Sequence, residues 1–185
     1  MMSNQRGTVD LRDFIVDGLF AGVQLGQTPE QVLGRLPAPD RADTEADGLG
    51  KGCEIWNYGH LELHFLDGAL FAISCDNFKS WDEAEGRSTD TWDAGPSINL
   101  EPWVFARPHS LTLDDMLGVL NGNAISFTLL HNPRHGNILI RILKSHVELV
   151  FESDIDADTT WAENPDSFRL TAFSLSTASA PHGPG

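Results

Sequence analysis

The stretch Cys53–Cys75, CEIWNYGHLELHFLDGALFAISC, carries the strongest fold signal in the chain. From His60 to Phe65 polar and apolar residues alternate, and this period of two predicts a strand with one face on a core and one face in water. Asp67-Gly68 then predicts a type I′ turn into a further strand, because both central residues of that turn need positive φ. A second tight turn before His60 leads back to an earlier strand. The stretch therefore predicts a three-stranded antiparallel meander.

The remaining elements are predicted from spacing and end signals. Leu11, Phe14 and Ile15 have helical spacing and predict a short helix over Asp10–Asp17. Thr28–Leu36 predicts a second helix, in which Thr28 is the N-cap, a proline takes the first helical position and a glutamine completes a capping box. Further strands are predicted at Ala124–His131, Asn137–Leu143, Val147–Phe151 and Phe168–Leu175.

Two pairs of segments resemble each other within the chain. TPEQVLGRL, which is Thr28–Leu36, aligns without a gap with TLDDMLGVL, which is Thr112–Leu120. HLELHF at His60–Phe65 aligns with HVELVF at His146–Phe151, at almost the same offset. Two independent matches at nearly one offset indicate an internal duplication.

The duplication predicts an α+β fold in which a helix plus antiparallel-sheet unit occurs twice in tandem, with the helices on one face of a curved sheet. We expect a first repeat over residues 1–80, an acidic linker containing tryptophans over 81–105, and a second repeat over 106–176. Residues 177–185 are expected to be a disordered tail.

The charge balance limits the partners that the chain can bind. Its 27 acidic residues against 12 lysines and arginines give a formal net charge of −15 over 185 residues. This balance disfavours nucleic acids and anionic membranes as partners, and suits a basic protein partner or simple solubility. No apolar run is long enough to span a membrane. The two cysteines, Cys53 and Cys75, are expected at opposite ends of the meander as free thiols, which favours the cytoplasm.

The first half of the chain also resembles a known family. The opening G-x-T-x-x-Q-V-x-x-x-L (Gly26 to Leu36), the W-x-Y-G strand (Trp56 to Gly59) and the F-x-D-G-x-L turn (Phe65 to Leu70) are similar to β-lactamase-inhibitory protein and to the small lipoprotein domains of the outer-membrane assembly machinery. The resemblance implies a tandem α+β fold and an inhibitor-type role. In size and acidity the chain is also similar to bacterial toxin-immunity proteins.

One candidate surface is the polar face of the predicted strands, with His60, Glu62 and His64 in the first repeat and His146 and Glu148 in the second. These residue types can bind zinc, but side chains four residues apart on a strand are about 13 Å apart, which is too far for one ion. We therefore expect no metal or other cofactor there, and read the face as a partner-binding or solvated surface. A small-molecule or metal site on this face is the alternative hypothesis.

The loop tryptophans are a second set of candidates. Tryptophan is enriched in binding hot spots, so residues placed in polar, acidic segments either bind a partner or cover the core. This set is Trp81, Trp92, Trp103 and Trp161. His131 and His135, in a predicted hairpin loop, could serve an enzyme as acid and base. The chain shows no nucleophile elbow or phosphate loop, so the leading prediction is a non-enzymatic cytoplasmic binding protein of the immunity or inhibitor type, acting on a basic protein.

Overall fold

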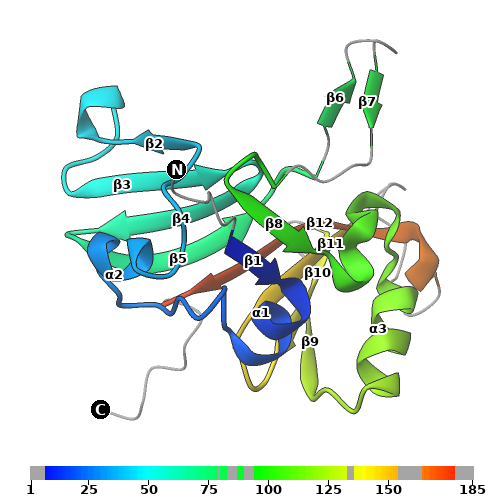
Figure 1. Ribbon diagram of the computed structural model, residues 1–185. Coiled ribbons are helices and arrows are strands. Elements are labelled where there is room, and N and C mark those ends of the chain that lie inside the picture. The colour runs from blue at the N-terminus through cyan, green and yellow to red at the C-terminus, as the bar shows by residue number, and fades with distance from the viewer. Residues whose placement is uncertain are drawn as a thin grey trace.

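A computed structural model of the chain describes residues 7–78, 80–82, 87–89, 94–132, 136–153 and 164–177. Its centre is an eight-stranded antiparallel sheet with the strand order β2-β3-β4-β5-β12-β11-β10-β9 (Figure 1). The strands of this sheet are β2 (Arg41–Asp43), β3 (Cys53–Tyr58), β4 (Leu61–Leu66), β5 (Ala69–Cys75), β9 (Phe127–Asn132), β10 (Asn137–Ile142), β11 (Glu148–Ser153) and β12 (Phe168–Ser176).

Helices and a small parallel strand pair cover one face of this sheet (Figure 1). The helices are α1 (Leu11–Asp17), α2 (Pro29–Leu33) and α3 (Leu113–Gly122), and the parallel pair is β1 (Gly7–Asp10) with β8 (Ile98–Glu101). Four 3₁₀ turns lie at η1 (Glu45–Asp47), η2 (Trp103–Ala106), η3 (Pro108–Ser110) and η4 (Pro165–Ser167). A separate hairpin of β6 (Ser80–Asp82) and β7 (Arg87–Thr89) stands away from the sheet.

The predicted meander is confirmed. β3, β4 and β5 follow one another as antiparallel neighbours. The predicted turn joins β4 to β5, with φ of 49° at Asp67 and 77° at Gly68. Leu61, Leu63 and Phe65 are buried, whereas the residues between them are half-buried, so the period of two identified the core face correctly. Cys53 and Cys75 lie at opposite ends of the meander, and both are free thiols.

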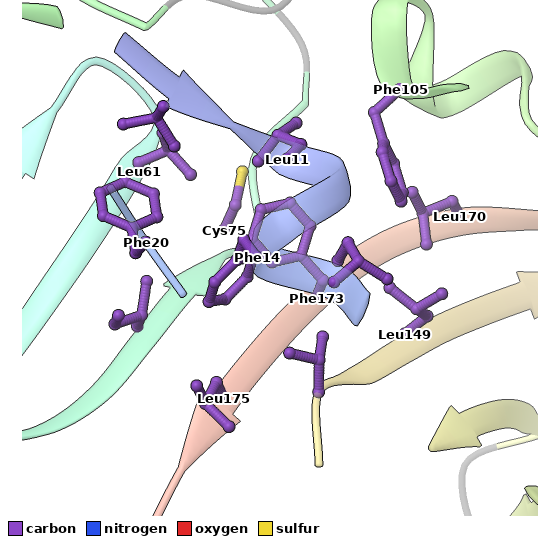
Figure 2. Close-up of a cluster of buried hydrophobic side chains, with 14 of the residues drawn as sticks. Leu11, Phe14, Phe20, Leu61, Cys75, Phe105, Leu149, Leu170, Phe173 and Leu175 are labelled. Atoms are coloured by element: carbon purple, nitrogen blue, oxygen red, sulfur yellow. The ribbon is translucent and has the colours of Figure 1, made fainter. Parts of the chain in front are cut away.

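The core lies between the sheet and the covering layer, and Phe173 of β12 is at its centre (Figure 2). Its ring centroid is 5.6 Å from that of Phe14 in α1, 5.9 Å from that of Phe78 and 6.1 Å from that of Phe105 in η2. One side chain of the sheet thus joins the first helix, the segment after β5 and the turn before α3. Because β12 pairs directly with β5, through Phe173 opposite Cys75, this core is continuous across the two halves of the chain.

The predicted fold class is wrong. The chain is mostly antiparallel sheet with few helices, and it is not a tandem repeat of a helix plus a sheet. The physical reason lies in the helices, which are short and unequal. Thr28 forms the predicted capping box and Thr112 forms one as well, but α2 stops after five residues whereas α3 continues for ten. Gly34 and then Pro37 follow α2, and neither favours a continued helix. The eight strands dominate, and they form one sheet.

Asp40 connects the start of the sheet to a distant segment. Its carboxylate accepts hydrogen bonds from the backbone N–H of Gly59 (2.9 Å) and of Ser97 (3.1 Å). Gly95 has φ of 72°, and a side chain there would collide with Asp40, so a glycine is required. The buried Tyr58 donates a hydrogen bond to the carbonyl of Pro37 at 2.8 Å. Burial, and secondly the negative charge of Asp40, raise the pKa of Tyr58 well above its usual value.

Candidate functional site

The face of the large sheet opposite the core, here called the open face, is crossed by a line of polar side chains. The strand pairings place one such residue on each of the eight strands, directly opposite its neighbour on the next strand. All eight are half-buried or exposed. This polar row consists of Arg41, Asn57, Glu62, Ser74, Ser174, Glu148, Arg141 and Thr128.

A second line of residues runs beside the polar row over the last four strands, and it is apolar. Each member lies two residues from a member of the polar row, and therefore on the same face. Ala172, Val150 and Leu139 are half-buried, and Leu130 is 39% exposed. We call Ala172, Val150, Leu139 and Leu130 the apolar row. Apolar residues bordered by polar and charged ones are the usual composition of a protein-binding surface.

His64 has two polar contacts on the open face. Its Nε2 lies 3.0 Å from Oε2 of Glu62, two residues away on β4, and 3.0 Å from Oγ of Ser74 on β5. A serine–histidine–acid relay needs the serine on one ring nitrogen and the acid on the other. Here both contacts are made by the same nitrogen, so the three side chains have the composition of a catalytic triad without its geometry. They order one another on the surface.

Arg141 and Glu148 form the corresponding charged pair in the second half of the polar row. They lie opposite each other on β10 and β11, and the Nε of Arg141 donates to Oε1 of Glu148 at 2.9 Å. The side chain of Glu148 is 18% exposed and that of Arg141 is 36% exposed. The pair neutralises its own charge, so the part of the open face around it carries little net charge.

The structure brings together only part of the predicted strand-face set. Glu62 and His64 are neighbours, and Glu148 lies farther along the same polar row. His60 precedes β4 in the turn that begins at Gly59, and its Nδ1 is buried with no hydrogen-bond partner among the described residues. His146 lies in the β10–β11 turn with φ of 63°. The two predicted strand histidines are therefore turn residues.

Of the predicted tryptophans, only Trp103 has a described side chain. It is half-buried in η2, packs against the core and has its ring centroid 6.0 Å from that of Phe105. It covers the core on the side of the sheet away from the open face. Trp81 belongs to β6, but its side chain is not described, and Trp92 and Trp161 lie outside the described residues, as does His135.

The apolar row and most of the polar row were not predicted from the sequence. The positions of Arg141 and Glu148 could have been predicted. The turn between Asn137–Leu143 and Val147–Phe151 is short, and it fixes a register that places Arg141 opposite Glu148. The β5–β12 pairing, which joins the two halves of the polar row, leaves no local signal in the sequence.

Within the described ranges, no group of three or more His, Cys, Asp or Glu side chains is arranged to hold a metal ion. In the same ranges no helix is both long and apolar enough to cross a membrane. A pocket of about 260 Å³ lies between α1 and the end of α3 and is lined by Arg12, Val16, residues 123–126 and Lys144. Lys144 is engaged by an ion pair with Asp17.

Comparisons with known proteins place the chain in no family. No family model and no curated protein matches it. One solved structure that it resembles is an extracellular protein containing an SCP domain from Bacillus anthracis, with 11% sequence identity and a TM-score of 0.32. The match covers 84% of this chain and 44% of that protein, so the chain spans less than half of its length. A likeness this weak carries no argument about fold or function.

Proposed function

We propose that the chain is a non-enzymatic binding protein that covers a surface of a partner protein with the open face of its large sheet. The observation that carries the proposal is the polar row, which crosses all eight strands beside the apolar row. The described helices and the β1–β8 pair all lie on the other side of the sheet. The open face thus offers apolar area for burial and polar groups for orientation.

The partner class follows from charge. With a formal charge of −15, the chain attracts basic proteins over long range and repels acidic ones. The carboxylate of Glu62 lies on the open face and pairs with His64, not with a lysine or arginine of the described residues. A basic protein occluded by this face, as an immunity or inhibitor protein occludes its target in the cytoplasm, is the function that fits best.

The contacts of His64 support binding over catalysis. Glu62 and Ser74 contact the same nitrogen of His64, which leaves no relay from acid to base to nucleophile. The alternative of a metal site on this face gains no support, since the predicted ligands His60 and His146 belong to turns and not to the strand face. We therefore propose protein binding and neither catalysis nor a metal site.

The test is capture from a lysate of the source organism, with the chain immobilised at low salt and washed at high salt. Three versions are compared: the native chain, Glu62→Gln and Val150→Thr. Asp114→Asn is the matched control, because it removes one exposed carboxylate from α3 on the other side of the sheet.

We expect a basic protein that is retained at low salt and released at high salt. Val150→Thr keeps the shape and strand propensity of the residue but adds a hydroxyl to the apolar row, and should weaken retention about tenfold. Glu62→Gln should weaken mainly the low-salt association rate. Equal retention by both open-face variants and Asp114→Asn, or the absence of any protein retained by the native chain, would count against the proposal.

A further inference from the structure

The two edges of the eight-stranded sheet differ in how they are protected. β2 is three residues long, and its Arg41 and Asp43 form an ion pair along the strand. Short length and charge are ways in which proteins prevent a sheet edge from pairing with another chain. β9, at the other edge, is twice as long, and its sequence FTLLHN contains no proline, lysine, arginine, aspartate or glutamate. β9 therefore has none of these protections.

The ladder between β9 and β10 shows which backbone groups of β9 face outward. The N–H of Leu143 donates to the carbonyl of Ser126 at 2.9 Å, within the register that pairs Thr128 with Arg141 and Leu130 with Leu139. Alternate pairs of an antiparallel ladder exchange hydrogen bonds, so Thr128 and Leu130 bond to β10. Phe127, Leu129 and His131 direct their N–H and C=O groups away from the sheet. In the part of the chain that the structure describes, no strand pairs with this side of β9.

Charge also sets this edge apart. The segment from Met116 to Val147 contains β9 and β10 and not one aspartate or glutamate, although the chain has 27 of them. It carries Arg134, Arg141 and Lys144. Two molecules that each carry −15 repel each other over most of their surfaces. Arg141 and Lys144 are paired with Glu148 and Asp17, but β9 itself has no carboxylate, so two copies can meet along β9 without placing carboxylate against carboxylate.

We propose that β9 pairs with β9 of a second copy of this chain, antiparallel and around a two-fold axis at Leu129, to form a sixteen-stranded sheet. In this register Leu129 faces Leu129 of the second copy, and Phe127 faces its His131. All three outward-directed residues then exchange hydrogen bonds, six in total, and no strand group at the edge is left over. Thr128 faces Leu130 of the second copy on the open face, so each apolar row meets the polar row of the other copy, and the two Leu130 side chains are diagonal neighbours. Isologous two-fold pairing of this kind closes on itself and leaves the protected β2 edges outermost.

The dependence on salt separates this proposal from the proposed function. Self-association works against the repulsion of two like net charges, so screening should strengthen it. Binding of a basic partner should weaken with salt for the opposite reason. If the chain dimerises but captures no partner, this proposal stands and the proposed function fails. If it captures a partner but stays a monomer, the reverse holds.

The first experiment measures the mass of the full chain by light scattering over a series of concentrations at low and high salt. We expect the mass to rise from 20.3 kDa toward twice that value, and at lower concentration in high salt. Leu130→Glu places a carboxylate at the acid-free edge and should raise the dimer dissociation constant at least tenfold. Leu33→Glu is the control, because Leu33 is also an exposed leucine, at 47%, but lies on α2. A mass of 20.3 kDa under every condition, or equal effects of the two variants, would overturn the proposal.

The second experiment tests the register and does not depend on how Leu130→Glu folds. A chain carrying Thr128→Cys is mixed with a chain carrying Leu130→Cys under mild oxidation. These positions form a non-hydrogen-bonded pair across the proposed axis, with Cα atoms about 4.5 Å apart, which a disulfide can span. A covalent dimer should form in the mixture and not in either chain alone or in the native chain. Equal cross-linking in the unmixed samples would refute this register.

Discussion

Replacing Phe173 with alanine should remove a large part of the stability of the whole domain. Phe173 is fully buried, and its ring lies within 6.1 Å, centroid to centroid, of the rings of Phe14, Phe78 and Phe105. Truncation of a buried phenylalanine to alanine typically costs about 3–5 kcal/mol, because transfer free energy is lost and a cavity remains. Three aromatic neighbours place Phe173→Ala in the upper part of that range, at about 4–5 kcal/mol.

That loss is comparable to the total stability of many domains, about 5–15 kcal/mol, so the variant should be marginally folded. The measurement is urea unfolding followed by tryptophan fluorescence. Phe173→Leu keeps most of the apolar volume and should cost less than half as much. Leu66→Ala truncates a leucine that is 44% exposed and should change the free energy of unfolding by less than about 1 kcal/mol. A loss below about 2 kcal/mol for Phe173→Ala would refute the view that β12 joins the two halves through one shared core.

Three further outcomes are expected. Tyr58 is the only tyrosine, so ultraviolet titration reports its pKa directly. Asp40→Asn should lower the pKa of Tyr58 but leave it above the usual value, because burial is the larger cause of the shift. An unchanged titration would contradict this. Since folding raises that pKa, the native chain should lose stability as the pH rises above the ordinary tyrosine value of about 10, and pH-dependent urea unfolding would show whether it does. Thr112→Ala removes the N-cap of α3, where Oγ1 accepts from the N–H of Asp115 at 3.0 Å, and should cost about 1–2 kcal/mol in urea unfolding, whereas a loss near zero would mean that packing alone holds the helix.

The strands could be predicted because their signal is local. Leu61, Leu63 and Phe65 alternate with polar residues, and Asp67-Gly68 specifies the turn, so a few neighbouring residues contain the whole pattern. The pairing of β5 with β12, and the parallel pairing of β1 with β8, connect segments about ninety to one hundred residues apart. Their partners are selected by the shared core and not by any short motif, so the single sheet could not be predicted from the sequence and the fold class was wrong.

The candidate site shows the same limit on a smaller scale. Alternation predicted correctly that Glu62 and His64 share a face, and they are in contact. The same alternation continues one residue into the turn at His60, where Gly59 has φ of 59° and the strand has not yet begun. At His146 a positive φ likewise places the residue in a turn. Residue pattern alone does not mark the end of a strand, because a polar turn residue and a polar residue on the open face look alike in the sequence.

The distribution of charge links the two proposals to one surface. Met116–Val147 is the longest run of the chain without a carboxylate, so the hairpin of β9 and β10 has no acidic residue although the chain has 27 of them. Because the chain as a whole is acidic, it attracts a basic protein. A second copy of the chain, which is also acidic, can approach most easily at the edge without carboxylates. Pairing at β9 would bring two open faces into one continuous sheet, with the two Leu130 side chains as diagonal neighbours at its centre. Such an assembly would bind a basic partner through two copies at once, so its retention should fall more steeply with dilution of the chain than a single site allows.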